Sequence, residues 1–199
     1  MNLRILNELD RILKNNPTLV SNEQSLCQVI NGVFNITLTS VDVSDIYTLE
    51  DSLEMILLLG EIFKVCKKTS EVCERIVSEA YRFSLTIQSK PKRKVAYLIW
   101  KKPYMAAGRN TFVNAMLELN NFENILSEEN SRYPEIELST LKSADLVLLS
   151  SEPFPFKESD VIELKKALQT EVLLVDGGYF SWYGSRLQNA FTYFKTLHP

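Results

Sequence analysis

Large apolar side chains follow three apolar segments in the second half of the chain, where loops normally carry polar residues. These segments end near Trp100, Ser151 and Asp176. The large side chains at or after their ends, with one more from the intervening segment SRYPEIELSTL, are Trp100, Tyr104, Met105, Tyr133, Phe154, Phe156, Tyr179, Phe180, Trp182 and Tyr183. Apolar surface of this extent in loops indicates a binding partner, and a wide, flat, amphipathic ligand would fit such a surface. The alternative is that these side chains pack beneath the loops or against a second lobe.

Basic residues are placed near the same segments. They are Lys101, Lys102, Arg109, Arg132 and Arg186. They are either ordinary solvated charges or contacts for carboxylate, amide or phosphate groups of a ligand.

Catalytic chemistry finds little support in the sequence. Glu152 and Asp176 would be the candidates for an acid–base pair, but no other feature points to a hydrolytic site. The single histidine, His198, is expected to be an exposed residue of the C-terminal tail, which excludes a His-built metal site or a Ser-His-Asp triad. Nucleotide-binding and nucleophile-elbow motifs are absent from the sequence. We therefore predict a protein that is not an enzyme, with no catalytic residue, metal or required cofactor.

Composition narrows the class of partner. The formal net charge of −3 argues against nucleic-acid binding. The longest apolar run, MILLLG, is far shorter than the roughly 20 residues of a transmembrane helix. Asp10 interrupts any secretory core near the start, so we predict no signal peptide and a cytoplasmic location for the chain as given. Cys27, Cys66 and Cys73 are predicted to be small buried hydrophobic residues without a disulfide bond.

The elements that would position the aromatic residues alternate regularly from residue 94 onward. VAYLIW, DLVLLSS and EVLLVDG read as buried parallel strands, and TFVNAMLELN, DVIELKKAL and SRLQNAFTYFKTL as helices. Gly177 and Gly178 are expected to allow a tight reversal after the third strand. Residues 94–199 are therefore predicted to form a doubly wound α/β lobe, whose strands bring their carboxyl ends to one edge.

The first half is predicted to be more helical. Residues 48–93 read as two helices and a polar linker: Thr48 caps the first helix, Gly60 serves close packing, and Thr69 or Ser70 starts the second. The second helix would run for about 28 Å, enough to bridge two lobes. Residues 1–47 read as a small, incomplete α/β lobe with two short strands.

Four segments in the second half have a specific order and spacing: KVAYLIWKKPYMAAGRNTFVNAMLELNNFENIL, RYPEIELSTL, DLVLLSSEPFPF and LLVDGGYFSWYGSRL. This set resembles the C-terminal lobe of the helical-backbone (class III) periplasmic binding proteins, specifically the cobalamin (vitamin B12) receptors of ABC transporters. DVSDIYTLEDSLEMILLLGEIF resembles the family's segment leading into its bridging helix, and NELDRILKNNPTLV resembles the end of its N-terminal lobe. The family's first strands and helices have no counterpart here, so the chain reads as an N-terminally shortened member.

The resemblance implies two lobes that clamp a corrinoid between them. Tyr104, Tyr133, Tyr179 and Phe180 are similar to residues that border the family's cleft. The position of residues at the strand ends adds further candidates, which are Trp100, Met105, Phe154, Trp182 and Arg186. The family docks to its permease through an acidic residue on each lobe. Asp10 resembles the first of these residues, whereas Ser139 stands at the second position with Glu137 nearby.

The predicted function is therefore that of a solute-binding protein of an ABC importer, binding cobalamin in an aromatic-lined cleft. One alternative is an iron–siderophore or haem ligand in the same fold. Another is a truncated module that no longer transports and works in interaction or sequestration. The resemblance implies a periplasmic location, and the incomplete N-terminal lobe suggests a homodimer that covers its open sheet edge.

Overall fold

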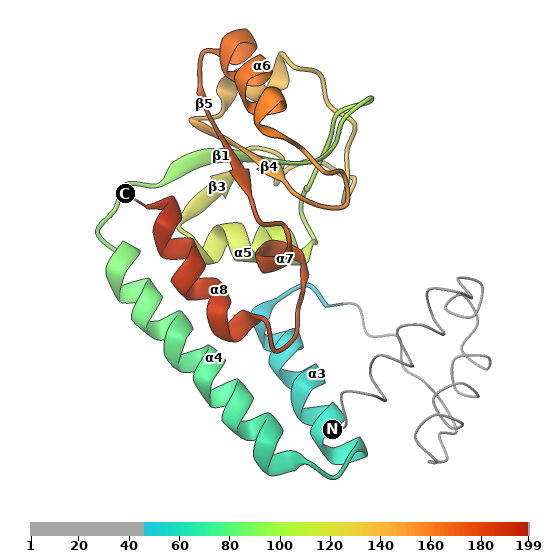
Figure 1. The fold of residues 1–199 in the computed structure, drawn as a ribbon, viewed down its shortest axis with the longest axis vertical. Helices are drawn as coiled ribbons and strands as arrows, with labels where there is room; N and C mark the ends of the chain where they lie inside the picture. Colours follow the sequence, from blue (N-terminus) through green and yellow to red (C-terminus); the bar gives the residue numbers. More distant parts are fainter. Residues whose placement is uncertain (1–45, 199) are drawn as a thin grey trace, which may run out of the picture. The chain divides into compact units, whose positions relative to one another are not determined.

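The described part of the protein comprises residues 46–198 of a computed structural model (Figure 1). By its internal contacts the chain divides into two units, residues 1–45 and 46–199. Asp10, Cys27 and the predicted strands and helices before residue 46 therefore lie outside the described residues. The predicted domain boundaries at 47/48 and 93/94 stay predictions.

A sheet of five strands forms the centre of the described unit. The strands are β1 (Arg93–Trp100), β2 (Met105–Ala106), β3 (Phe122–Asn124), β4 (Leu146–Ser150) and β5 (Glu171–Val175). β1 pairs in parallel with β4, and β4 pairs in parallel with β5. The other edge of β1 is shared, because β3 pairs with its first half in parallel and β2 with its second half antiparallel. The three long strands are those predicted, and β2 and β3 are additions.

Helices cover both faces of this sheet (Figure 1). The helices are α3 (Leu49–Ile62), α4 (Cys66–Ile87), α5 (Phe112–Leu119), α6 (Glu158–Leu168), α7 (Gly178–Ser181) and α8 (Leu187–Phe194), with the short 3-10 helices η2 (Thr140–Ser143) and η3 (Lys195–Leu197). Along β1, Val95 and Tyr97 join the core beneath α3, α4, α5, α7 and α8. Ala96 and Leu98 join the core beneath α6. This alternation follows from the two-residue repeat of a strand and confirms the α/β class, with a mainly parallel sheet.

The start of α3 lies where the sequence places it. Thr48 Oγ1 accepts a hydrogen bond from the Asp51 amide at 3.1 Å, and the Asp51 carboxylate accepts from the Thr48 amide at 2.9 Å. These reciprocal bonds form a capping box, which satisfies two amide groups that the helix itself leaves unpaired. The amides of Tyr47 and Thr48 both donate to the Asp51 carboxylate, and these bonds lower the pKa of Asp51.

The start of α4 differs from the prediction. The helix begins at Cys66 rather than at Thr69 or Ser70, and its N-cap Val65 makes no side-chain capping bond. Its position is set by contact with α3, because a Cβ atom at Gly60 would lie only 2.0 Å from Thr69 Oγ1. The predicted packing role of Gly60 is thereby confirmed. Cys73 is buried as predicted, but the first turn leaves Cys66 exposed, so the prediction for Cys66 was wrong.

With 22 residues, α4 is about 33 Å long at the helical rise per residue. Its buried residues Cys73, Ile76, Phe83 and Ile87 belong to the same core as β1 and β4. Its role as a bridge between lobes stays a prediction, since the first lobe lies outside the described residues. Residues 46–198 contain no helix suited to crossing a membrane.

The C-terminal tail returns to the amino ends of the strands. The His198 ring stacks on Phe122 with ring centres 4.9 Å apart, and lies 5.8 Å from Phe83. Lys90 Nζ donates to the His198 carbonyl at 2.7 Å. The prediction of an exposed tail histidine was therefore wrong: the imidazole fills space between α4 and β3. Burial, reinforced by the positive charges of Lys90 and Arg93, lowers the pKa of His198.

Candidate functional site

The strand order places a switch point between β1 and β4. The chain passes from β1 to β3 on one side, and from β4 to β5 on the other. In open α/β sheets, ligands bind beyond the carboxyl ends of strands at such a point. Because β1, β4 and β5 are parallel neighbours, the segments after Trp100, Ser150 and Val175 all leave the sheet at this carboxyl edge.

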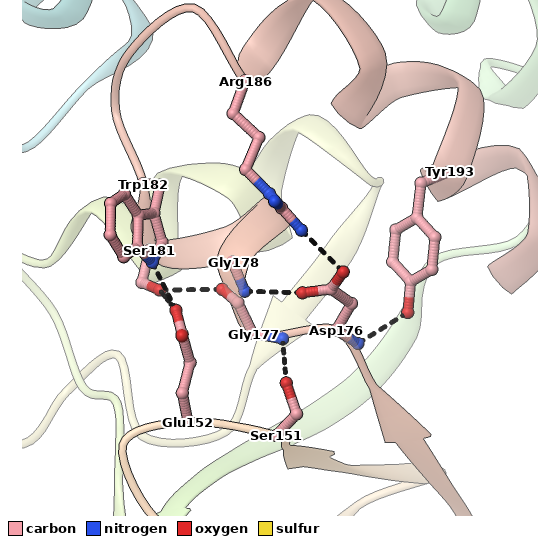
Figure 2. A network of polar contacts seen from close by, with 9 residues as sticks. All are labelled: Ser151, Glu152, Asp176, Gly177, Gly178, Ser181, Trp182, Arg186 and Tyr193. Carbon is pink, nitrogen blue, oxygen red and sulfur yellow. Dashed lines mark hydrogen bonds and ion pairs between the residues drawn. The ribbon is translucent and has the colours of Figure 1, made fainter. Parts of the chain in front are cut away.

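The segment after β5 is held by an ion pair, drawn in Figure 2, and by a stack of rings. The guanidinium of Arg186 donates to Asp176 Oδ2 at 2.7 Å and lies 4.5 Å from the centre of the Tyr179 ring. The Tyr179 ring stacks on Tyr193 at 4.6 Å, and the Tyr193 hydroxyl accepts from the Asp176 amide at 2.9 Å. Arg186 is thus fixed on one side by a carboxylate and on the other by an aromatic face.

A second set of bonds joins the segment after β5 to the loop after β4 (Figure 2). The Gly177 amide donates to Ser151 Oγ at 3.0 Å. Glu152 Oε1 accepts from Ser181 Oγ at 3.0 Å and from the indole N–H of Trp182. A Cβ atom at residue 177 would lie 2.3 Å from Ser150 Oγ and 2.7 Å from Glu152 Cγ. Gly177 therefore serves the close approach of two loops, and not the reversal that the sequence suggested, since it has no positive φ.

An open hollow of about 560 Å³ adjoins this network. Its lining consists of Met55 from α3 and residues 181–186. Trp182 is 60% exposed at its wall, and Arg186 lines it as well. Tyr183 is anchored beside it, with its ring 5.7 Å from Phe112 and its carbonyl accepting from Ser52 Oγ at 3.2 Å. The hollow therefore combines apolar walls with a few polar groups, as small-molecule sites do.

Aromatic residues also cluster where β1 and β4 end. The Trp100 ring lies 5.5 Å from Phe154, which in turn lies 4.8 Å from the buried Phe156. Trp100 remains 41% exposed, while Phe154, Tyr104 and Met105 are half-buried. Burial raises the pKa of the Tyr104 hydroxyl.

Lys101 fastens this cluster to α6. Its ammonium group donates to Asp160 and to Glu163, each at 2.7 Å. These bonds raise the pKa of Lys101 and lower that of Asp160. Lys101 is therefore committed to carboxylates of its own chain, as Arg186 is.

Tyr133 lies in a segment that runs beside β2, at the side of the sheet. The Ala106 amide donates to the Pro134 carbonyl at 3.1 Å, and the Ile136 amide to the Tyr104 carbonyl at 2.9 Å. Tyr133 is 42% exposed, and the guanidinium of Arg132 lies 5.7 Å from its ring centre. Glu137, the residue considered for permease docking, is exposed just beyond this segment.

The structure removes one residue from the predicted set. Phe180 is fully buried, with its ring 5.0 Å from Tyr97 and 4.9 Å from Phe194. The α7 turn directs Tyr179 outward and Phe180 into the core, so the proposal that Phe180 borders a cleft was wrong. The other predicted positions keep some exposure; they are Trp100, Tyr104, Met105, Tyr133, Phe154, Tyr179, Trp182 and Arg186.

Two residues of the candidate site were not predicted in these roles from the sequence. Met55 lies on α3, far from the strand ends in sequence, and no pattern marks it as a lining residue. Glu152 was considered only for acid–base work with Asp176. In the structure each carboxylate bonds to a different neighbour, Glu152 to Trp182 and Asp176 to Arg186. Within residues 46–198, no three His, Cys, Asp or Glu side chains are grouped to hold a metal ion.

Known structures of similar fold are binding proteins. A possible iron-binding (periplasmic solute-binding) protein of Staphylococcus epidermidis is 18% identical, with a TM-score of 0.71, over 88% of this chain and 72% of that chain. The periplasmic haem-binding protein of Vibrio cholerae is 18% identical, with a TM-score of 0.67, over 88% and 72%. The periplasmic vitamin B12-binding protein of Vibrio cholerae is 14% identical, with a TM-score of 0.63, over 85% and 68%. These likenesses show that the chain has the fold of periplasmic binding proteins.

The chain spans only part of the length of the structures that it matches. It covers 72%, 63% and 57% of three of the matched structures. No curated protein sequence is significantly similar to it.

The family model described as periplasmic binding protein matches residues 7–162. Proteins of this family bind a transported substrate, carry no cofactor and partner with ABC permeases, and they are not enzymes. Since the match spans most of the 199 residues, the chain belongs to the periplasmic binding protein family.

Proposed function

We propose that this protein is the substrate-binding component of an ABC importer and that it binds cobalamin or a related corrinoid. The ligand would lie against the carboxyl edge of the sheet, over the hollow beside Trp182. No bond would be made or broken, and specificity would come from packing against aromatic rings. The periplasm, the family's compartment, would be the place of binding.

The observation that carries this proposal is the exposure of aromatic rings at one edge. Trp182 and Tyr183 line the hollow, and Trp100 is exposed where β1 ends. Exposed aromatic rings can contribute strongly to the binding of a flat ligand, because each ring buries a large apolar area at a low cost in conformational entropy.

Two basic residues of the edge are already paired with carboxylates of the chain, which favours a corrinoid over an anionic chelate at these two positions. Arg186 is paired with Asp176, and Lys101 with Asp160 and Glu163. An incoming carboxylate would have to compete with these internal partners. A ligand that carries neutral amides meets no such competition and can accept or donate hydrogen bonds at the rim.

An iron–siderophore or haem is the second candidate. It is favoured by the fold neighbours that bind iron and haem, and by the exposed guanidinium of Arg186, which has further N–H donors for a carboxylate. Permease docking would involve Glu137 on the described unit and Asp10 on the first. A homodimer through residues 1–47 stays a prediction.

The test is a calorimetric titration of the 199-residue chain with cyanocobalamin, haemin and a ferric hydroxamate siderophore. We expect saturable binding of cyanocobalamin at micromolar or tighter affinity, and weaker binding of the two other ligands. Preference for haemin or the siderophore would replace the corrinoid with the second candidate. Absence of binding by all three, with the protein folded, would contradict the proposed function.

A further inference from the structure

Trp182 combines an exposed ring with a bonded indole N–H. Its ring is largely exposed at the wall of the hollow, and its indole N–H is nevertheless bonded to a carboxylate from another loop, that of Glu152 (Figure 2). An exposed tryptophan without such a bond changes rotamer on the picosecond to nanosecond scale. A charge-assisted hydrogen bond at the edge of the ring restricts this motion while leaving both ring faces free.

Glu152 is itself held in place. Gly177 packs directly on its side chain, since a Cβ atom at residue 177 would lie 2.7 Å from Glu152 Cγ. Its backbone is fixed through Ser150, whose hydroxyl donates to the Glu152 carbonyl, and the neighbouring Ser151 accepts from the Gly177 amide. The acceptor for Trp182 therefore stands in the loop directly after β4, tied to the carboxyl end of that strand at the switch point of the sheet.

We propose that Glu152 is a positioning residue, which holds the Trp182 ring in its ligand-binding orientation before the ligand arrives. Preorganisation of this kind raises affinity because the side chain has already lost its rotamer freedom in the free protein. The same oxygen also lies near Ser181, so one carboxylate fixes two successive residues of the hollow's wall. The consequence for ligand affinity rests on the proposed function, whereas the consequence for the mobility of Trp182 does not.

The mobility is measured without ligand. The chain has two tryptophans, Trp100 and Trp182, so Trp100→Phe leaves Trp182 as the only reporter. In this background, Glu152→Ala is expected to shorten the nanosecond anisotropy decay of Trp182 and to raise its quenching by acrylamide. Glu152→Gln keeps an acceptor oxygen at the same place and is expected to stay close to the parent. Glu123→Ala removes an exposed carboxylate at the opposite end of the sheet and serves as the matched control.

The affinity is measured with cyanocobalamin, in chains that keep both tryptophans. Glu152→Ala is expected to weaken binding about two- to tenfold, the range for releasing one immobilised side chain. Glu152→Gln should restore most of the affinity, and Glu123→Ala should leave it unchanged. Thermal unfolding of each variant establishes that the fold is intact, and rescue by glutamine excludes the loss of charge as the cause.

The outcomes distinguish the two proposals. A freed Trp182 with weakened binding in Glu152→Ala, both recovered in Glu152→Gln, supports the positioning role. An equally immobile Trp182 in Glu152→Ala overturns it, and so does a freed Trp182 with unchanged affinity. If the parent chain binds none of the chelates while Glu152→Ala frees Trp182, the contact is upheld as a restraint on the ring and the proposed function fails.

Discussion

Aromatic rings gather at both ends of the parallel sheet, with opposite exposure. At the amino end, the rings of Phe83, Phe122 and His198 pack on one another between α4 and β3. At the carboxyl end, Trp100 and Trp182 keep about half of their surface exposed, although each contacts a neighbouring side chain. The type of a residue alone therefore does not decide whether an aromatic ring packs in the core or is exposed. The rings at the amino end pack in the core, as Phe156 and Phe180 do at the carboxyl end, whereas Trp100 and Trp182 are exposed and are the rings that we propose contact a ligand.

The largest expected difference is between a buried and an exposed ring of the same segment when each is replaced by alanine. Phe180→Ala is expected to lower the free energy of unfolding by about 3–5 kcal/mol, because it leaves a cavity beneath β1 and α8. Trp182→Ala, two residues later, should change it by less than about 1 kcal/mol, as for most surface positions. Urea denaturation of both variants measures the difference. Similar losses would mean that Trp182 is part of the core, contrary to its exposure.

A smaller effect is expected at the amino end, where His198 makes stability depend on pH. The lowered pKa of His198 means that the folded protein resists protonation of the imidazole. The unfolded chain, with an ordinary histidine pKa near 6.5, binds more protons below that pH. The contribution of His198 to stability is therefore fully present above about pH 6.5, and it is lost as the pH falls below that value.

The measurement is the free energy of unfolding between pH 7.5 and about 5, in the wild type and in His198→Gln, which does not titrate in this range. Carboxylates contribute equally to both proteins, so the difference isolates the imidazole. Parallel pH profiles would show that His198 is not buried in its neutral form, and that the tail is no part of the aromatic packing.

The long elements could be predicted because each carries its own pattern. β1, β4 and β5 are continuous apolar runs, and α3 begins with a capping box that can be read directly from Thr48 and Asp51. β2 and β3, with two and three residues, are strands only because β1 lies beside them. The start of α4 was missed for a similar reason, since contact between Gly60 and Thr69 fixes it without any capping residue.

The site was predictable as a region but not in its details. Parallel strands dictate that the segments after Trp100, Ser150 and Val175 share an edge, and the structure has them there. Which side chain faces outward depends on the single turn of α7, which separates Tyr179 from Phe180. The bond from Trp182 to Glu152 spans thirty positions, and local spacing carries no sign of it.

The proposed contact between Trp182 and the ligand is tested by calorimetric titration of the wild type and of Trp182→Ala with cyanocobalamin, alongside thermal unfolding of both proteins. If the exposed ring at the carboxyl edge is a main contact of the ligand, Trp182→Ala should lose about tenfold or more in affinity, as expected for a buried aromatic contact, with an almost unchanged melting temperature. Equal affinity of the two proteins, or absence of binding by the folded wild type, would contradict the account.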